Sequence, residues 1–309
     1  MKKILVALGG NAILKKGEKG TYNHLIKNIR DSYKQLLPLI KKNKIIITFG
    51  NGPQAGILAI QNELAKNKFS QMPLDVIGAE SQGWIGYLLE KELINLLKQN
   101  KIKKEVVTIL TQVLVDKKDK SFRNPTKFIG PFYKKNEISK LKKQGYKIKE
   151  DPRGGYRRVV PSPKPLKIIE ENTIKKLIDK GTIVISCGGG GIPVYKNKDK
   201  LVGIEGVIDK DLASQCLASS LNFNELIIIT DINKVAINYK KPNQKFLSKL
   251  KFKDSKKYLL EKEFPPGSMG PKVQASNNFL SKGGKKVIIT NIKNIKKALE
   301  SREGTIITK

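Results

Sequence analysis

Short apolar segments alternate with segments of helical periodicity along most of this chain. The expected strands cover residues 3–8, 44–49, 105–115, 182–187, 225–230, 234–239, 286–290 and 305–308. The expected helices cover residues 23–41, 54–66, 75–98, 166–180, 210–221 and 271–282. Alternation of this kind predicts an α/β fold, in which a mainly parallel sheet is covered by helices on both faces.

The alternation stops between about residues 116 and 165. That stretch is rich in Lys, Pro, Gly and aromatic residues, as in "SFRNPTKFIGPFY" and "DPRGGYRRVVPSPKP". Because so long a segment without secondary structure is improbable inside a compact domain, we expect a small inserted hairpin subdomain, or lid, at this place. The alternating segments before and after the lid are expected to share one continuous sheet.

Composition is typical of an ordinary globular protein. The chain has 309 residues, 39% of them hydrophobic, and can form one large or two modest domains. No apolar run reaches the roughly 18–20 residues of a membrane span, and the N-terminus lacks the features of a signal peptide. We therefore expect a cytoplasmic protein without a membrane partner. Cys187 and Cys216 do not suffice for a disulfide framework or a closed zinc site, and the single histidine, His24, begins a polar helix, so chemistry built on histidine is disfavoured.

The formal net charge of +34 raises the question of nucleic-acid binding. Of the 61 basic residues six are arginine, which leaves 55 lysines, and these are spread over the whole chain. Such a distribution indicates a general amino-acid bias and solvated lysine faces rather than a nucleic-acid-binding arm. We expect no nucleic-acid partner, although the charge would attract anionic metabolites.

Three glycine-rich turns follow expected strands: "LGGNA" (8–12), "FGNGPQ" (49–54) and "SCGGGGIP" (186–193). Glycines at strand ends let backbone N–H groups approach an anion closely. Neither GxxxxGK[ST] nor GxGxxG occurs, so P-loop and Rossmann sites are disfavoured. No lysine stands in or beside the first turn, and the positive charge for a phosphate must therefore come from elsewhere. The candidate anion-binding residues are Gly9, Gly10, Asn11, Gly50, Asn51 and Gly52.

Two lysines stand at expected helix starts. "VIDKDLAS" places Lys210 and Asp211 at the start of one helix, and "PPGSMGPKVQA" places Lys272 in the first turn of another. Lysine at a helix N-terminus opposes the helix dipole, which makes sense if a polyphosphate lies between the two ends. Asp211 could pair with both lysines, help to position a magnesium ion, or simply be a favourable helix-start carboxylate.

A third lysine, Lys127, stands in the lid segment "NPTKFIGPFY" between Pro125 and Pro131. The two prolines fix φ and Gly130 permits a tight turn, so this lysine is poorly explained as a solvated surface residue. Three nearby arginines are open to two interpretations, phosphate binding or pairing with acidic groups: Arg153, Arg157 and Arg158.

Taken together, these segments resemble the carbamate kinases of the amino acid kinase superfamily. The resemblance runs nearly end to end and is carried by "ALGGNA", "GNGPQ", "NPTKFIGPFY", "RRVVPSPKP", "CGGGGIPV", "VIDKDLAS", "TDINKVAINYKKPNQ" and "PPGSMGPKVQA". It implies a three-layer αβα sandwich around an open, mainly parallel eight-stranded sheet, with the lid protruding from it, and a homodimer. The implied reaction converts carbamoyl phosphate and ADP into carbamate and ATP with Mg²⁺, as in the last step of arginine deiminase fermentation.

The resemblance also implies roles for individual residues. Carbamate or carbamoyl phosphate would bind to the N-terminal part, residues 1–207, and the nucleotide to the C-terminal part, residues 208–309. Lys127 and Lys272 would act on the transferring phosphoryl group, Lys210 on the nucleotide phosphates, and Asp211 would organise the lysines. The glycine-turn residues would hold carbamate and the phosphoryl group. The implied nucleotide-binding residues are Lys210, Asp231, Met269, Gly270 and Lys272; metal ligands are not indicated.

Four residues, at three sites in the sequence, depart from related patterns. Relatives that phosphorylate amino acids carry a lysine where this chain has Ala7, so the lid's Lys127 is expected to supply that charge. Phe128 replaces a usual proline, and Lys262-Glu263 replace a usual Gly-His. Two alternatives stay open: another amino acid kinase, of the acetylglutamate or uridylate type, or a basic nucleic-acid-binding or regulatory protein on an inactive kinase fold.

Overall fold

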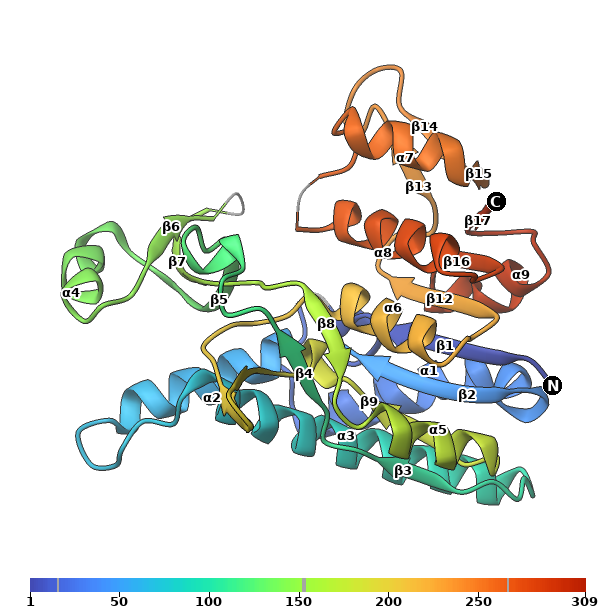
Figure 1. The fold of residues 1–309 in the computed structure, drawn as a ribbon, viewed down its shortest axis with the longest axis horizontal. Helices are drawn as coiled ribbons and strands as arrows, with labels where there is room; N and C mark the ends of the chain where they lie inside the picture. Colours follow the sequence, from blue (N-terminus) through green and yellow to red (C-terminus); the bar gives the residue numbers. More distant parts are fainter. Residues whose placement is uncertain (16, 152–153, 266) are drawn as a thin grey trace.

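A computed structural model describes residues 1–15, 17–151, 154–265 and 267–309. Its centre is an eight-stranded sheet of order β15-β17-β16-β12-β1-β2-β9-β3 (Figure 1). The six strands from β16 to β3 are parallel, whereas β17 runs antiparallel to β16. The expected eight-stranded, mainly parallel sheet is confirmed. Its strands are β1 (Lys3–Leu8), β2 (Lys44–Phe49), β3 (Val106–Thr108), β9 (Ile183–Ser186), β12 (Glu225–Thr230), β15 (Lys249–Lys251), β16 (Lys286–Asn291) and β17 (Thr305–Thr308).

Helices cover both faces of this sheet, because successive strand residues point to opposite sides. Leu5 and Ala7 of β1 join the apolar cluster under one helix layer, and Ile4 and Val6 join the cluster under the other. The expected three-layer sandwich is therefore confirmed. One layer contains α5 (Glu171–Asp179), α6 (Lys210–Ser220) and α8 (Met269–Ser281); the other contains α1 (Tyr22–Lys42), α3 (Leu74–Gln99) and α9 (Ile295–Leu299).

Two expected elements were wrong in detail. The expected strand 105–115 is two strands in different sheets, because the chain turns at Thr111, where the Gln82 side chain accepts the Thr111 N–H at 3.0 Å and donates to its carbonyl at 3.2 Å. The expected helix 166–180 begins only at Glu171, since the residues before it pair as a strand. The second of these two strands and the strand before α5 pair in a separate four-stranded sheet. Its strands are β4 (Gln112–Val115), β8 (Pro165–Ile168), β10 (Ile192–Asn197) and β11 (Lys200–Gly203).

The lid is confirmed as a protruding subdomain, joined to the body through β4 and β8 (Figure 1). It contains a three-stranded antiparallel sheet and packs its first strand against α2 (Gly52–Ala65). The Tyr146 hydroxyl also donates to Glu63 of α2 at 2.8 Å. The lid elements are β5 (Lys127–Tyr133), α4 (Ile138–Lys143), β6 (Ile148–Glu150) and β7 (Tyr156–Val160).

A second small unit follows β12 in the chain and lies above α8 and the edge strands β15 and β17 in the view of Figure 1. It holds the hairpin of β13 (Val235–Ile237) and β14 (Lys245–Leu247), and α7 (Phe252–Leu260), which the periodicity analysis missed. Short 3₁₀ turns are η1 (Gly10–Ala12), η2 (Lys120–Phe122), η3 (Lys135–Glu137), η4 (Gly188–Gly190) and η5 (Ile292–Asn294). No helix in the described ranges combines the length and apolarity that a membrane crossing requires.

Candidate active site

The first two glycine turns meet at the carboxyl edge of the central sheet. A Cβ on Gly9 would lie 2.6 Å from the Ile229 carbonyl oxygen, so only glycine fits between β1 and β12 there. A Cβ on Gly50 would lie 3.3 Å from the Gly10 nitrogen and 3.5 Å from Cδ of Lys210. The two turns and the Lys210 side chain therefore converge on one place.

The third turn, η4, closes on the second. Gly189 has a φ of 65°, and a Cβ on it would lie 2.1 Å from Oδ1 of Asn51. The Asn51 amide donates to the Ser81 hydroxyl at 2.6 Å, so this buried side chain is held between α3 and η4. Sequence reasoning proposed Asn51 as a ligand but did not identify Ser81 as its support.

The other two proposed turn residues lie at element starts. Asn11 is exposed in the middle of η1, and Gly52 is the first residue of α2. Because α2 begins here, its first N–H groups lie beside the second glycine turn. An anion held on backbone amides fits this arrangement.

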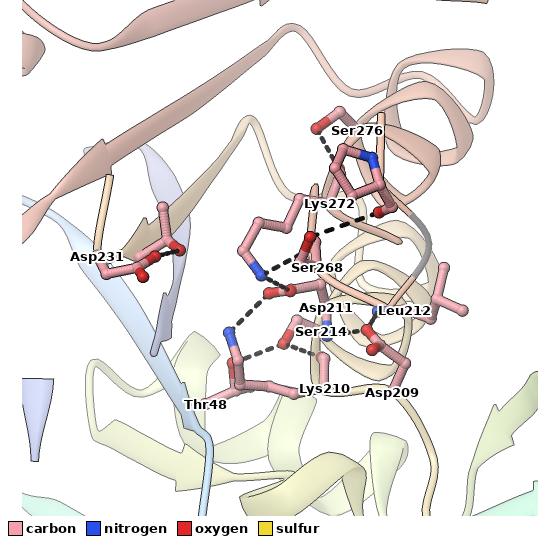
Figure 2. A network of polar contacts seen from close by, with 12 residues as sticks. Thr48, Asp209, Lys210, Asp211, Leu212, Ser214, Asp231, Ser268, Lys272 and Ser276 are labelled. Atoms are coloured by element: carbon pink, nitrogen blue, oxygen red, sulfur yellow. Dashed lines mark hydrogen bonds and ion pairs between the residues drawn. The ribbon is translucent and has the colours of Figure 1, made fainter. Parts of the chain in front are cut away.

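Asp211 binds both of the helix-start lysines (Figure 2). Lys210 Nζ lies 2.6 Å from Asp211 Oδ1, and Lys272 Nζ lies 2.9 Å from Asp211 Oδ2. The carboxylate is buried, while the lysine side chains are 14% and 17% exposed. Both ion pairs that the sequence suggested are thus present, and they join the N-terminus of α6 to that of α8.

These ion pairs govern the protonation of the cluster. Burial by itself raises the pKa of Asp211, but the Lys210 and Lys272 ammonium groups outweigh it and hold that pKa well below its ordinary value. Burial lowers the pKa of Lys210, an effect that Asp211 partly offsets and Lys272 adds to. For Lys272 the attraction of Asp211 outweighs burial and raises the pKa. The carboxylate is therefore ionised at neutral pH.

The first turn of α6 is fixed from two sides. Asp209 is its N-cap, and Oδ1 accepts the N–H groups of Asp211 at 3.0 Å and Leu212 at 3.4 Å. The Ser214 hydroxyl donates to the Lys210 carbonyl at 2.6 Å and also lies 2.7 Å from the Thr48 hydroxyl on β2. Lys210 and Asp211 therefore project from a rigid helix start.

The lid's lysine reaches the same helix start. Lys127 Nζ donates to Asp209 Oδ2 at 3.1 Å, and the two side chains are 32% and 14% exposed. Lys127, Lys210 and Lys272 thus come from the lid, α6 and α8 and all pair with carboxylates at the start of α6. Sequence reasoning missed Asp209, although an Asp directly before an expected helix is a common N-cap signal.

Arg157 and Arg158, two of the three arginines that the sequence left open, are paired with protein groups. Arg157 contacts the Asp151 carboxylate at 3.2 Å and the Gly130 carbonyl at 2.8 Å, and Arg158 contacts Glu205 at 3.1 Å. The sequence left phosphate binding and pairing with acidic groups open; in the structure both residues pair with acidic groups. Arg153 lies outside the described residues.

A cavity of about 410 Å³ opens beside Lys272, between β12, the β13–β14 hairpin and the start of α8. Of the expected nucleotide-binding residues, Asp231 and Met269 line this cavity, whereas Gly270 is packed against the Pro265 carbonyl. Two exposed aromatic side chains that sequence reasoning did not single out, Tyr239 and Phe246, also line the cavity.

The departures from the family pattern at Lys262-Glu263 and at Phe128 can be located in the structure. Glu263 accepts the Asn238 N–H at 2.8 Å and so supports the turn that carries Tyr239, while Lys262 adopts a φ of 58°. Phe128 lies in β5 and pairs with Val159 of β7, so the strand next to Lys127 is regular without the usual proline.

Comparison with known proteins gives a consistent picture. The model of the amino acid kinase family matches residues 2–291. Carbamate kinase from Pyrococcus horikoshii is 44% identical, with 99% of each chain covered, and that from Clostridium perfringens is 45% identical, with 99% of this chain and 100% of the relative covered. The solved structure of carbamate kinase from Giardia lamblia bound to AMP-PNP matches with a TM-score of 0.93 at 42% identity, over 99% of this chain and 98% of that one.

Proposed function

Because the chain belongs to the amino acid kinase family, and within it to the carbamate kinases, we propose that it catalyses reversible phosphoryl transfer from carbamoyl phosphate to ADP. The products are carbamate and ATP. The observation that carries the proposal is the cluster of Lys127, Lys210 and Lys272 around two aspartates, beside three glycine turns. The experiment that tests it is ATP formation from carbamoyl phosphate and ADP, with acetyl phosphate as the comparison.

The chemistry needs charge and placement rather than a covalent nucleophile. Negative charge spreads over the phosphoryl oxygens in the transition state, so in-line positioning and nearby cations suffice. Lys127 and Lys272 contact the transferring group, and Lys210 contacts the nucleotide phosphates. Asp211 holds Lys210 and Lys272 without taking part in proton transfer. The carbamate and phosphoryl oxygens bind to Gly9, Gly10, Asn11, Gly50, Asn51 and Gly52.

The nucleotide occupies the cavity beside Lys272, and residues 208–309 form the nucleotide-binding part. Asp231, Met269 and Lys272 line that cavity; Gly270 contributes by letting the chain pack closely against Pro265. Tyr239 and Phe246 are 50% and 60% exposed, and a nucleobase in this cavity would cover part of both rings. Residues 1–207, with the lid at about 116–165, form the carbamate-binding part.

Magnesium enters with the nucleotide in this proposal. Within the described ranges, no three His, Cys, Asp or Glu side chains are grouped to hold a metal ion. Mg²⁺ in kinase sites uses one or two carboxylates together with phosphate oxygens and water, and Asp231, which lines the nucleotide cavity, fits that need. When bound, the ion would neutralise charge on the phosphate oxygens.

We also propose that the enzyme is a cytoplasmic homodimer that generates ATP at the end of arginine deiminase fermentation. The edge strand β3 borders a hollow of about 490 Å³ that is lined by Tyr87, Ile94 and Leu110. Tyr87 and Leu110 are 60% and 51% exposed, and a second copy of the chain would cover them and the strand edge. Sedimentation of wild-type protein and a Leu110→Asp variant tests this interface.

The alternatives have weaker support. Two features count against another amino acid kinase. Ala7 stands where amino-acid-phosphorylating relatives carry lysine, and the 116–165 insertion forms the lid. A nucleic-acid-binding protein on an inactive fold has no need of three lysines arranged around two aspartates. Failure to form ATP from carbamoyl phosphate would revive that alternative.

A further inference from the structure

Asp209 uses its two carboxylate oxygens for two different contacts. Oδ1 accepts the backbone N–H groups of Asp211 and Leu212 and caps α6. Oδ2 accepts from the ammonium group of Lys127, which lies 82 positions earlier in the chain. One side chain therefore joins the start of α6 to the lid.

The backbone keeps these two residues together. Lys127 pairs with Val160 at the root of the lid. Next to it, the Pro161 carbonyl accepts the N–H of Val207 at 2.9 Å, in the segment that leads to Asp209. A backbone hydrogen bond therefore already joins the base of the lid to the segment before α6, next to the Lys127–Asp209 contact. The contact does not require any movement of the outer part of the lid.

The Lys127–Asp209 contact also balances the charge at the start of α6. Asp211 already binds Lys210 and Lys272, and a third ammonium group brought to the same helix start would be repelled by them. Asp209 supplies the second carboxylate, so that three cations face two anions before a phosphoryl group arrives. The remaining positive charge is what an anionic substrate needs.

We infer that Asp209 is a positioning residue for phosphoryl transfer: it holds the Lys127 ammonium group at the start of α6, through the oxygen that does not cap the helix. This inference rests on the proposed function. It assigns Asp209 a role through Lys127, distinct from that of Asp211, which organises the other two lysines.

Asp209→Asn separates the two contacts, because asparagine caps a helix about as well as aspartate but offers no charge to Lys127. We expect kcat to fall about tenfold to a hundredfold, as for a misplaced reacting group, while the melting temperature stays within about 2 °C of wild type. Asp209→Ala should show the same loss of kcat and a further fall in melting temperature.

Glu205→Gln is the matched control. It removes the Arg158–Glu205 ion pair, which joins the lid to the same segment of chain but involves no lysine of the site. We expect kcat to change less than about twofold, as for an exposed ion pair. The change in Asp209→Asn would then not be a general effect of loosening the lid.

A double-mutant cycle with Lys127→Met gives the decisive readout. If Asp209 acts through Lys127, Asp209→Asn should change the residual kcat of the Lys127→Met enzyme by less than about threefold. An equal loss in both backgrounds, or a kcat in Asp209→Asn above half that of wild type, would overturn the inference.

Acylation of Lys127 by acetic anhydride, followed by mass spectrometry, tests the contact without activity. Without the carboxylate the Lys127 side chain is no longer held against the start of α6 and is more open to the reagent, so Asp209→Asn should raise the labelling rate at Lys127 and Glu205→Gln should not. An unchanged rate at Lys127 contradicts the contact. If wild type makes no ATP, the proposed function fails and this role with it, whereas active wild type with unaffected Asp209→Asn refutes the role alone.

Discussion

Lys272 Nζ lies 2.9 Å from Asp211 Oδ2, although the two residues are 61 positions apart in the chain. The other oxygen of Asp211 binds Lys210 at 2.6 Å. A single buried carboxylate therefore sets the separation of two ammonium groups on two different helices. This relationship explains how two lysines can stand at helix N-termini, where the helix dipole disfavours them.

Asp211→Asn should be both inactive and unstable. The variant leaves two largely buried ammonium groups without their counter-ion, so we expect the free energy of unfolding to fall by about 3 kcal/mol and kcat to fall at least about a hundredfold. Urea unfolding and steady-state kinetics measure the two effects. Asp179→Asn is the control, because Asp179 also binds two lysines, Lys3 and Lys175, but on the surface; it should change little.

The stability difference between wild type and Asp211→Asn should depend on pH. The pKa of Asp211 is lower in the folded protein than its ordinary value of 3.8, so its carboxylate stabilises the fold above that value and loses this effect as pH falls below it. Urea titrations from pH 7 to pH 3 should show a constant difference above about pH 5 that shrinks below about pH 4. A difference that grows with acid would contradict the assignment.

Lys127→Ala should lower kcat by about two to four orders of magnitude and leave the fold intact, because in our proposal this lysine supplies the lid's charge to the phosphoryl group. Circular dichroism and thermal unfolding check the fold. Lys149→Ala, which removes an exposed lysine elsewhere in the lid, should keep kcat near wild type. Near-normal turnover in Lys127→Ala would show that the charge comes from another residue.

Adjacent glycines of the first turn should respond differently to alanine. At Gly9 the new Cβ would meet the Ile229 carbonyl at 2.6 Å, so Gly9→Ala should cost about 1–3 kcal/mol of stability. At Gly10 it meets nothing within 4 Å, so Gly10→Ala should unfold like wild type. Its kcat/KM for carbamoyl phosphate should nevertheless fall about tenfold. Equal kinetics for Gly10→Ala and wild type would place the substrate elsewhere.

Much of the fold could be predicted from local pattern. Strands with continuous apolar runs, such as 44–49 and 225–230, were found with their bounds, because a strand buried on both faces reads as an uninterrupted run. The predicted secondary structure was wrong where contacts between distant parts of the chain determine it. The turn at Thr111 depends on the Gln82 side chain, 29 positions away, and residues 165–168 become a strand only because β4 lies beside them.

The site shows the same division. The positions of Lys127, Lys210, Asp211 and Lys272 follow from helix starts and from a resemblance that spans the chain. The cap role of Asp209 could have been predicted from its place before a helix, but its contact with Lys127 crosses 82 positions and could not. Tyr239 and Phe246 were missed because a hairpin without strong periodicity carries them to the cavity. Long-range contacts of this kind leave no spacing signal in a single sequence.

The most direct measurement is the rate of ATP formation from carbamoyl phosphate and ADP, followed by a coupled hexokinase and glucose-6-phosphate dehydrogenase assay. The purified protein should form ATP with Mg²⁺ present, and more slowly from acetyl phosphate. The Lys127→Ala protein should lose this activity. Absence of ATP formation by folded wild type, or equal rates from both acyl phosphates, would contradict the account.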